Sequence, residues 1–184
     1  MTFVETRLPG VLVIEPERHE DERGFFARSW CRSEFAARGL NASLAQCNIS
    51  YTKTRGTVRG MHYQSAPWRE AKLVRCTRGA IHDVVLDVRR EAPTYGRWVA
   101  VRLTADDRRM LYVPEGMAHG FQTLADDTEV FYQMSEPYHA EAERGVRWND
   151  PACAIEWPIA PVIVSARDAA LPPLGGEHDA CSPC

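Results

Sequence analysis

The stretch RGTVRGMHYQSAPWREAK, residues 55–72, places an arginine, a histidine and a lysine close together beside apolar side chains. Burying unpaired charge costs several kcal/mol, so a globular core does not call for Arg59, His62 and Lys72 in one short strand-like run. Strict alternation would put Arg59 and His62 on opposite faces, and a β-bulge at Gly60 would bring them to one face. The stretch therefore predicts a ligand site built on a strand.

Short apolar segments separated by turn residues surround this stretch. Such spacing predicts an all-β sandwich or barrel with a few short helices. One helix is expected at residues 33–38, with Ser33 as its N-cap and Gly39 at the C′ position. The expected strands are residues 11–14, 72–77, 80–88, 97–103, 110–113, 119–124 and 128–134.

Alternation assigns the faces of two of these strands. Tyr132 falls on an apolar face of residues 128–134, so it should point into the interior, where its hydroxyl needs a partner. In residues 80–88, Asp83 and Asp87 share a face with apolar side chains.

Length and charge limit the class of protein. A chain of 184 residues supports one domain, residues 1–184, with a Gly- and Pro-containing flexible or extended tail at residues 171–184. The net charge of −3 is spread without a basic stripe, so neither nucleic acid nor a membrane surface is the expected partner. No apolar run is long enough for a signal peptide or a membrane span. A cytoplasmic protein with a small-molecule ligand is expected.

The six cysteines are irregularly spaced, which is not typical of a disulfide framework. Cys181 and Cys184 form a CxxC motif near His178, but a structural zinc site needs four ligands and the chain has no second CxxC. We therefore expect no metal site in the tail.

Two histidines resemble those of the two cupin motifs, which favours a cupin-type jelly-roll barrel. Gly56 stands six residues before His62, and residues 114–119 have the form PxGxxH, ending at His119. Metal-binding cupins add a second histidine and a glutamate, but here the second position is Gln64 and Glu70 is offset. With His62 and His119 alone, a tight divalent site is not expected, and the barrel is predicted to hold no metal.

Without a metal, these residue types suit proton transfer. A histidine, with an unperturbed pKa of about 6.5, is a natural general base, and a lysine ammonium can stabilise an enolate oxygen. A tyrosine can return a proton, and arginines such as Arg23 and Arg59 suit phosphate oxygens. The set suggests deprotonation beside a carbonyl of a phosphorylated or nucleotide-linked substrate. Taken singly, His62 is better explained as a satisfied core histidine, Tyr132 as a barrel residue, and Asp168 as an exposed acid or an N-cap.

A series of motifs, in order along residues 11–168, resembles the dTDP-4-dehydrorhamnose 3,5-epimerase family. The resemblance implies a homodimeric cupin-type jelly roll that epimerises a nucleotide-linked 4-keto-6-deoxyhexose without a cofactor. The motifs are DERGFF (21–26), RGTVRGMHYQ (55–64), KLVRC (72–76), APTYGRW (92–98), VPEGMAHGF (113–121) and RGVRWNDP (144–151).

The resemblance also implies roles for individual residues. His62 matches the base that removes the proton next to the C4 ketone, assisted by Asp168 in the run SARD. Lys72 matches the enolate-stabilising lysine, and Tyr132 the tyrosine that reprotonates the opposite face. Tyr138 matches the ring that stacks on the nucleobase. The matches to substrate-binding positions are Arg23, Phe26, Gln46, Asn48, Arg59, Lys72, His119, Tyr138, Glu143 and Arg167.

Three positions depart from the family pattern. Arg28 stands where glutamate is usual, Cys47 where aspartate is usual, and Gln133 where lysine is common. Because of the charge reversal at Arg28, the identity of the nucleobase and of the sugar is not determined, and a CDP- or GDP-linked substrate is an alternative. Epimerisation at C3 alone is a further alternative. A non-catalytic sugar-nucleotide-binding cupin and a metal-dependent cupin oxygenase are alternatives of another class.

Overall fold

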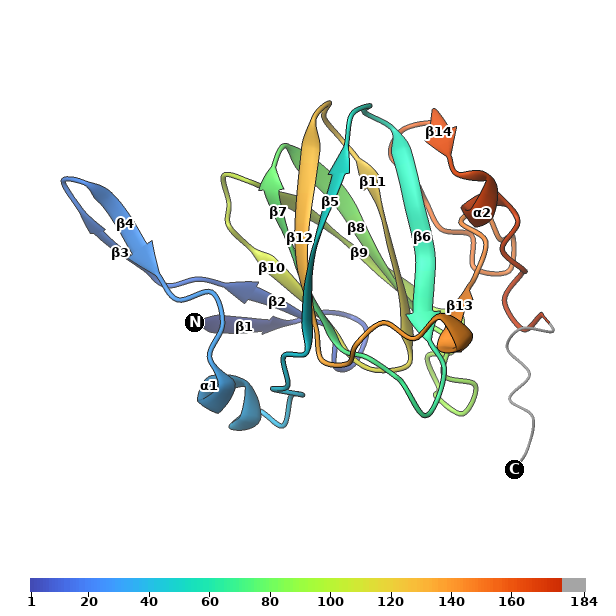
Figure 1. Ribbon diagram of the computed structural model, residues 1–184, viewed down its shortest axis with the longest axis horizontal. Helices are drawn as coiled ribbons and strands as arrows, with labels where there is room; N and C mark the ends of the chain where they lie inside the picture. Colours follow the sequence, from blue (N-terminus) through green and yellow to red (C-terminus); the bar gives the residue numbers. More distant parts are fainter. Residues whose placement is uncertain (177–184) are drawn as a thin grey trace.

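A computed structural model describes residues 1–176 and shows two β-sheets that face each other (Figure 1). The first sheet is antiparallel and has the order β1 (Thr2–Glu5), β2 (Leu12–Glu15), β10 (Met110–Val113), β7 (Lys72–Arg78), β12 (Thr128–Met134) and β5 (Gln46–Thr52). The second has the order β13 (Glu143–Gly145), β6 (Thr57–Gln64), β11 (Met117–Thr123), β8 (Ala80–Asp87) and β9 (Trp98–Thr104). From β5 to β12 the chain crosses repeatedly between the two sheets, and only β8 and β9 follow one another in the same sheet, which is the arrangement of a jelly roll.

The main core fills the space between the sheets. Ile81 and Val85 of β8 meet Leu111 of β10 and Val130 of β12 in one buried cluster. Asp83 lies fully buried on the same face of β8, as the alternation predicts. The inward face of the barrel is therefore apolar at most positions and polar at a few.

The outer face of the first sheet is covered by α1 (Arg32–Ala36), whose Phe35 packs on Tyr112 of β10. The helix ends at Ala36 with Ala37 as its C-cap, earlier than the predicted end at residue 38, and Gly39, predicted at C′, lies in the turn that follows, with φ +69°. Its beginning was predicted wrongly. Cys31, not Ser33, is the extended N-cap residue, without a side-chain capping bond, and Ser33 lies inside the first turn.

The outer face of the second sheet is covered by C-terminal chain. Here η1 (Ala140–Ala142) precedes β13, and β14 (Ile163–Val164) pairs in parallel with β6 before α2 (Ala166–Ala169). Residues 171–174, which begin the tail expected to be flexible or extended, contact the barrel: Arg147 N bonds Pro172 O at 2.9 Å, and Leu174 packs on the apolar cluster. The CxxC at Cys181 and Cys184 lies outside the described residues.

Several strands carry no apolar alternation and were not predicted. The hairpin of β3 (Arg18–Asp21) and β4 (Gly24–Ala27) is mostly exposed and projects away from the barrel (Figure 1). Strand β5 reverses the usual pattern, with Ile49 exposed on its outer side. A strand is hard to recognise when its inward side chains are polar, as they are along a binding site.

A β-bulge brings Arg59 and His62 to the same side of β6, as predicted. His62 pairs with His119 on β11, whereas Arg59 pairs with Phe121, so one extra residue lies on β6. Gly60 has φ +119°, and a Cβ there would stand 2.6 Å from Gly120 Cα. Only glycine fits this close approach of the two strands.

Residues 1–176 contain no helix long and apolar enough to cross a membrane. The same residues contain no group of three or more His, Cys, Asp and Glu side chains placed to hold a metal ion.

Candidate active site

A cavity of about 550 Å³ opens inside the barrel between the two sheets. Its wall is formed by the inward faces of β5, β6, β7, β11 and β12 and by the segment that carries α2. The structure thus gathers candidates that lie far apart in the sequence. The predicted site residues that line it are Gln46, Asn48, Arg59, His62, Lys72, His119, Tyr132, Tyr138, Glu143, Arg167 and Asp168.

His62 and Asp168 form a hydrogen-bonded pair at the edge of this cavity. His62 Nε2 lies 2.9 Å from Asp168 Oδ1, and Asp168 is buried. Because a carboxylate only accepts hydrogen bonds, the proton of a neutral His62 ring lies on Nε2, and Nδ1 keeps the lone pair. His62 is therefore placed as a general base whose ring is oriented by the Asp168 carboxylate.

Three local features fix Asp168 against β6. Strand β14 runs beside β6 and delivers α2 to the cavity. Ser165 caps α2 by accepting from Asp168 N at 3.0 Å, and Gly60 N donates to Asp168 Oδ2 at 3.0 Å. Burial raises the pKa of the Asp168 carboxyl, but the hydrogen bonds from His62 and Gly60 outweigh burial, so its pKa lies below the ordinary value.

This lowered pKa predicts a pH-dependent contribution to stability. An ionised Asp168 stabilises the fold above its unfolded pKa of about 3.9, and this contribution is lost as pH falls through the lower folded value. Asp168→Asn should therefore cost about 1–3 kcal/mol at pH 7 and less at pH 3, measured by urea unfolding. The exposed Asp106→Asn serves as control and should cost nothing at either pH. A cost for Asp168→Asn that does not change with pH would contradict the prediction.

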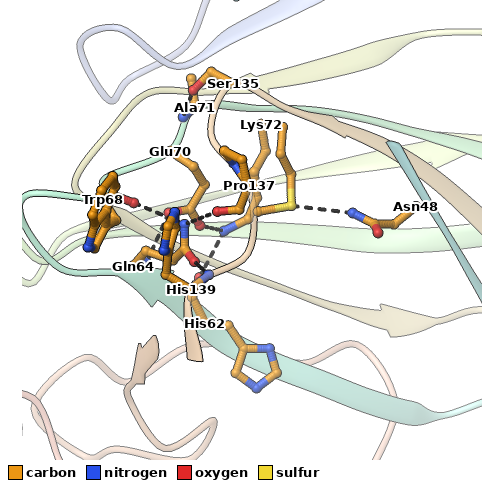
Figure 2. A network of polar contacts seen from close by, with 11 residues as sticks. Asn48, His62, Gln64, Trp68, Glu70, Ala71, Lys72, Ser135, Pro137 and His139 are labelled. Carbon is orange, nitrogen blue, oxygen red and sulfur yellow. Dashed lines mark hydrogen bonds and ion pairs between the residues drawn. The ribbon is translucent and has the colours of Figure 1, made fainter. Parts of the chain in front are cut away.

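Lys72 points into the cavity from β7 and is 8% exposed. Its ammonium contacts the Glu70 carboxylate and donates to the main-chain oxygen of His62 at 3.3 Å (Figure 2). An ammonium held beside the histidine base is suited to stabilise negative charge that develops on a substrate oxygen.

Tyr132 reaches the cavity from β12 of the first sheet, whereas His62 reaches it from β6 of the second. Burial raises the pKa of the Tyr132 hydroxyl; the Arg59 charge lowers it and the Glu70 charge raises it further. The hydroxyl therefore keeps its proton at neutral pH and is a proton donor rather than a base. The base and the donor approach the cavity from facing sheets.

A second histidine–carboxylate pair closes the inner end of the site. His119 Nε2 lies 2.7 Å from Asp83 Oδ1, and both residues are buried. The His119 ring is therefore fixed in orientation as part of the cavity wall.

Polar side chains and an aromatic ring line the outer part of the cavity. Arg59 Nε donates to Thr52 Oγ1 at 2.9 Å, which holds the guanidinium along β5. The Tyr138 ring is 51% exposed, and its hydroxyl donates to Glu143 at 2.7 Å. Glu143 also forms an ion pair with Arg167. A half-exposed aromatic ring is suited to stack on a nucleobase, and the arginines near it are suited to bind a diphosphate.

The side-chain amides at the start of β5 hold the main chain at Tyr138, which carries this ring. Gln46 Oε1 accepts from Tyr138 N at 3.0 Å, and Gln46 Nε2 donates to Asn48 Oδ1 at 2.9 Å. Asn48 in turn contacts the Met134 sulfur at 3.3 Å.

The structure does not bring Arg23 or Phe26 to this cavity. Both lie on the projecting β3–β4 hairpin, where the Arg23 side chain is 85% exposed and pairs with Asp21. The unusual Arg28 lies nearby and pairs with Glu34 of α1. Within one chain, the hairpin and the cavity are separate.

The sequence interpretation missed several lining residues. Ser50 follows Gln46 and Asn48 at the period of a strand, so recognising β5 would have found it. Ser165 stands three residues before Asp168, the spacing of an N-cap. Glu70 was considered only as a displaced metal ligand, and nothing in its spacing indicates its contact with Lys72.

Comparisons with known proteins identify the family that this chain resembles. A family model described as dTDP-4-dehydrorhamnose 3,5-epimerase matches residues 5–175. A dTDP-4-dehydrorhamnose 3,5-epimerase of Shigella flexneri is 42% identical over 169 residues, which cover 91% of this chain and 93% of that protein. A crystal structure of the enzyme from Elizabethkingia anophelis matches with a TM-score of 0.93 at 35% identity, covering 97% of this chain and 98% of that one.

A second similar structure is a 3′-monoepimerase from Streptomyces bikiniensis in complex with dTDP-quinovose. It matches with a TM-score of 0.84 at 34% identity, covering 92% of this chain and 86% of that one. With these neighbours, the predicted all-β, cupin-type jelly roll is confirmed.

Proposed function

Because the chain belongs to the dTDP-4-dehydrorhamnose 3,5-epimerase family and is an isomerase of that type, we propose that it inverts C3 and C5 of a dTDP-linked 4-keto-6-deoxyhexose. One observation carries the proposal: His62, Lys72 and Tyr132 meet in one cavity, with Asp168 behind His62. A binding module needs no oriented base opposite a protonated donor. An epimerase needs both.

The proposed reaction begins at a carbon next to the C4 ketone. His62 removes its proton, and the electrons of the C–H bond move to the ketone oxygen and form an enolate. Asp168 accepts the Nε2–H hydrogen bond and stabilises the imidazolium, while Lys72 donates a hydrogen bond to the enolate oxygen. These contacts lower the cost of the charged intermediate.

Reprotonation then completes the inversion. Tyr132, which enters from the facing sheet, gives its proton to the opposite face of the same carbon, and the electrons return to restore the C4 ketone. Nothing is oxidised or reduced, so the step balances with protons alone. His62 and Tyr132 regain their starting states by proton exchange with water.

The nucleotide is proposed to occupy the outer part of the cavity. Arg59 and Arg167 suit the diphosphate, and Tyr138 offers a ring for stacking on the base. Because Arg28 replaces a usual glutamate, the relative rates with dTDP-, CDP- and GDP-linked sugars test this assignment. A preference for dTDP is expected.

We also propose a cytoplasmic homodimer in which the β3–β4 hairpin of one copy reaches the cavity of the other. Support comes from the hairpin itself: it projects from the barrel, and it carries Arg23 together with Phe26, which is 72% exposed (Figure 1). An exposed aromatic side chain beside an arginine suits an interface that also contacts substrate.

Mixed dimers test the hairpin assignment. Co-expressed Arg23→Ala and His62→Asn chains, carrying different affinity tags, should form heterodimers with one intact site and one doubly defective site. These heterodimers should recover about half of the wild-type activity per dimer, whereas each variant homodimer should be nearly inactive. Heterodimers as inactive as the homodimers would contradict sharing of the hairpin.

Product stereochemistry distinguishes the proposed reaction from its closest alternative. Similarity to a 3′-monoepimerase keeps inversion at C3 alone as the second candidate. After incubation with dTDP-4-keto-6-deoxyglucose, borohydride reduction fixes the sugar for analysis of its configuration. Inversion at both C3 and C5 is expected, and inversion at C3 alone would favour the second candidate.

A further inference from the structure

A buried carboxylate that lines the cavity has no role in the reaction described above. Glu70 is 4% exposed and lies on the loop between β6 and β7. One of its oxygens contacts the Lys72 ammonium, and the other accepts from Gln64 N at 3.0 Å (Figure 2). Such a charge inside a protein needs a partner, and here the partner is Lys72.

The contacts of Lys72 determine which of its hydrogens faces the substrate. An ammonium has three N–H donors. One meets the Glu70 carboxylate and one the main-chain oxygen of His62. Because two of the three N–H donors are engaged, the direction of the third is fixed. Since Lys72 lines the cavity, this third N–H is the one available to a substrate.

Glu70 is itself held by a network centred on Gln64. Gln64 Nε2 donates to the main-chain oxygens of Trp68 at 2.9 Å and Pro137 at 3.1 Å, and its Oε1 accepts from His139 N at 2.6 Å (Figure 2). The Trp68 and His139 rings stack with centroids 4.0 Å apart. These contacts join the loop that carries Glu70 to the chain after β12, so the carboxylate cannot easily turn away.

We propose that Glu70 is a positioning residue for epimerisation, which holds the Lys72 side chain so that one N–H is directed at the enolate oxygen. This inference rests on the proposed function. It assigns to Glu70 an effect on the rate of proton transfer, because the enolate charge develops after binding. The affinity for the nucleotide, whose proposed contacts lie in the outer part of the cavity, should not depend on Glu70.

The test uses Glu70→Gln, which removes the charge and keeps the side-chain shape. We expect kcat to fall about 10- to 100-fold, with KM and the dissociation constant for dTDP unchanged within about twofold. Glu129→Gln is the matched control, since Glu129 accepts from Thr77 Oγ1 at 2.7 Å outside the cavity, and its kcat should stay at the wild-type value. An unchanged kcat for Glu70→Gln would overturn the inference.

A double-mutant cycle separates positioning from a general structural role. In a Lys72→Met background, Glu70→Gln should cause no further loss of the residual exchange rate, because its effect acts through Lys72. Glu70→Gln/Lys72→Met also removes both charges of the pair, so it should fold even if Glu70→Gln alone does not. An equal loss in both backgrounds would overturn the inference. A wild-type protein that catalyses no exchange would instead overturn the proposed function.

Discussion

Replacing His62 by asparagine is expected to slow hydrogen exchange at both C3 and C5 of the substrate by about 10²- to 10⁴-fold. The variant keeps a polar side chain but has no basic nitrogen to accept the substrate proton. Because Asp168 orients His62 through Nε2, removal of the ring also leaves that carboxylate without its partner. The rate is measured by proton NMR in heavy water, and dTDP affinity by calorimetry.

Nucleotide affinity separates chemistry from binding in this variant. The proposed nucleotide contacts, Arg59 and Tyr138, do not bond to the His62 ring, so the dissociation constant for dTDP should stay within about threefold of wild type. His82→Asn is the control, because His82 packs against Trp157 outside the cavity. Substrate exchange that survives His62→Asn at the wild-type rate would exclude His62 as the base.

Replacing Tyr132 by phenylalanine is expected to separate proton loss from inversion. The variant keeps the ring but loses the hydroxyl that enters from the sheet facing His62. Formation of inverted product should fall about 10²-fold, while exchange of the substrate proton with solvent persists at a larger fraction of the wild-type rate. Both rates come from one NMR time course.

A second buried tyrosine provides the control for this substitution. The Tyr112 hydroxyl accepts from Asn41 N at 3.0 Å, and burial raises its pKa to about 12, but it lies outside the cavity. Tyr112→Phe should leave the ratio of exchange to inversion unchanged. If Tyr132→Phe also leaves that ratio unchanged, another group returns the proton.

The jelly roll was predictable where strands bury apolar side chains. Residues such as Ile81 and Val130 alternate with the period of a strand, and they form the core between the sheets. Strand β5 was not predictable in this way, because its inward residues line the cavity and are polar while Ile49 is exposed. Because the site requires polar residues on the inward face, the strand lacks the apolar alternation by which strands are predicted.

Most of the residues that the motifs placed in the site line the cavity, but the contacts between them were not predictable. The conflict between Arg59 and His62 pointed to the bulge at Gly60, because the strand period is strict. The contact between Glu70 and Lys72 depends on how the loop after β6 folds back, which local spacing does not encode. The position of Arg23 on a hairpin remote from its own cavity likewise depends on chain packing.

The most direct test of the account is proton NMR of wild-type enzyme with dTDP-4-keto-6-deoxyglucose in heavy water. The C3 and C5 proton signals of the sugar are both expected to disappear as deuterium enters from solvent. Persistence of both signals, with CDP- and GDP-linked analogues inert as well, would contradict the assignment of this cavity as an epimerase site.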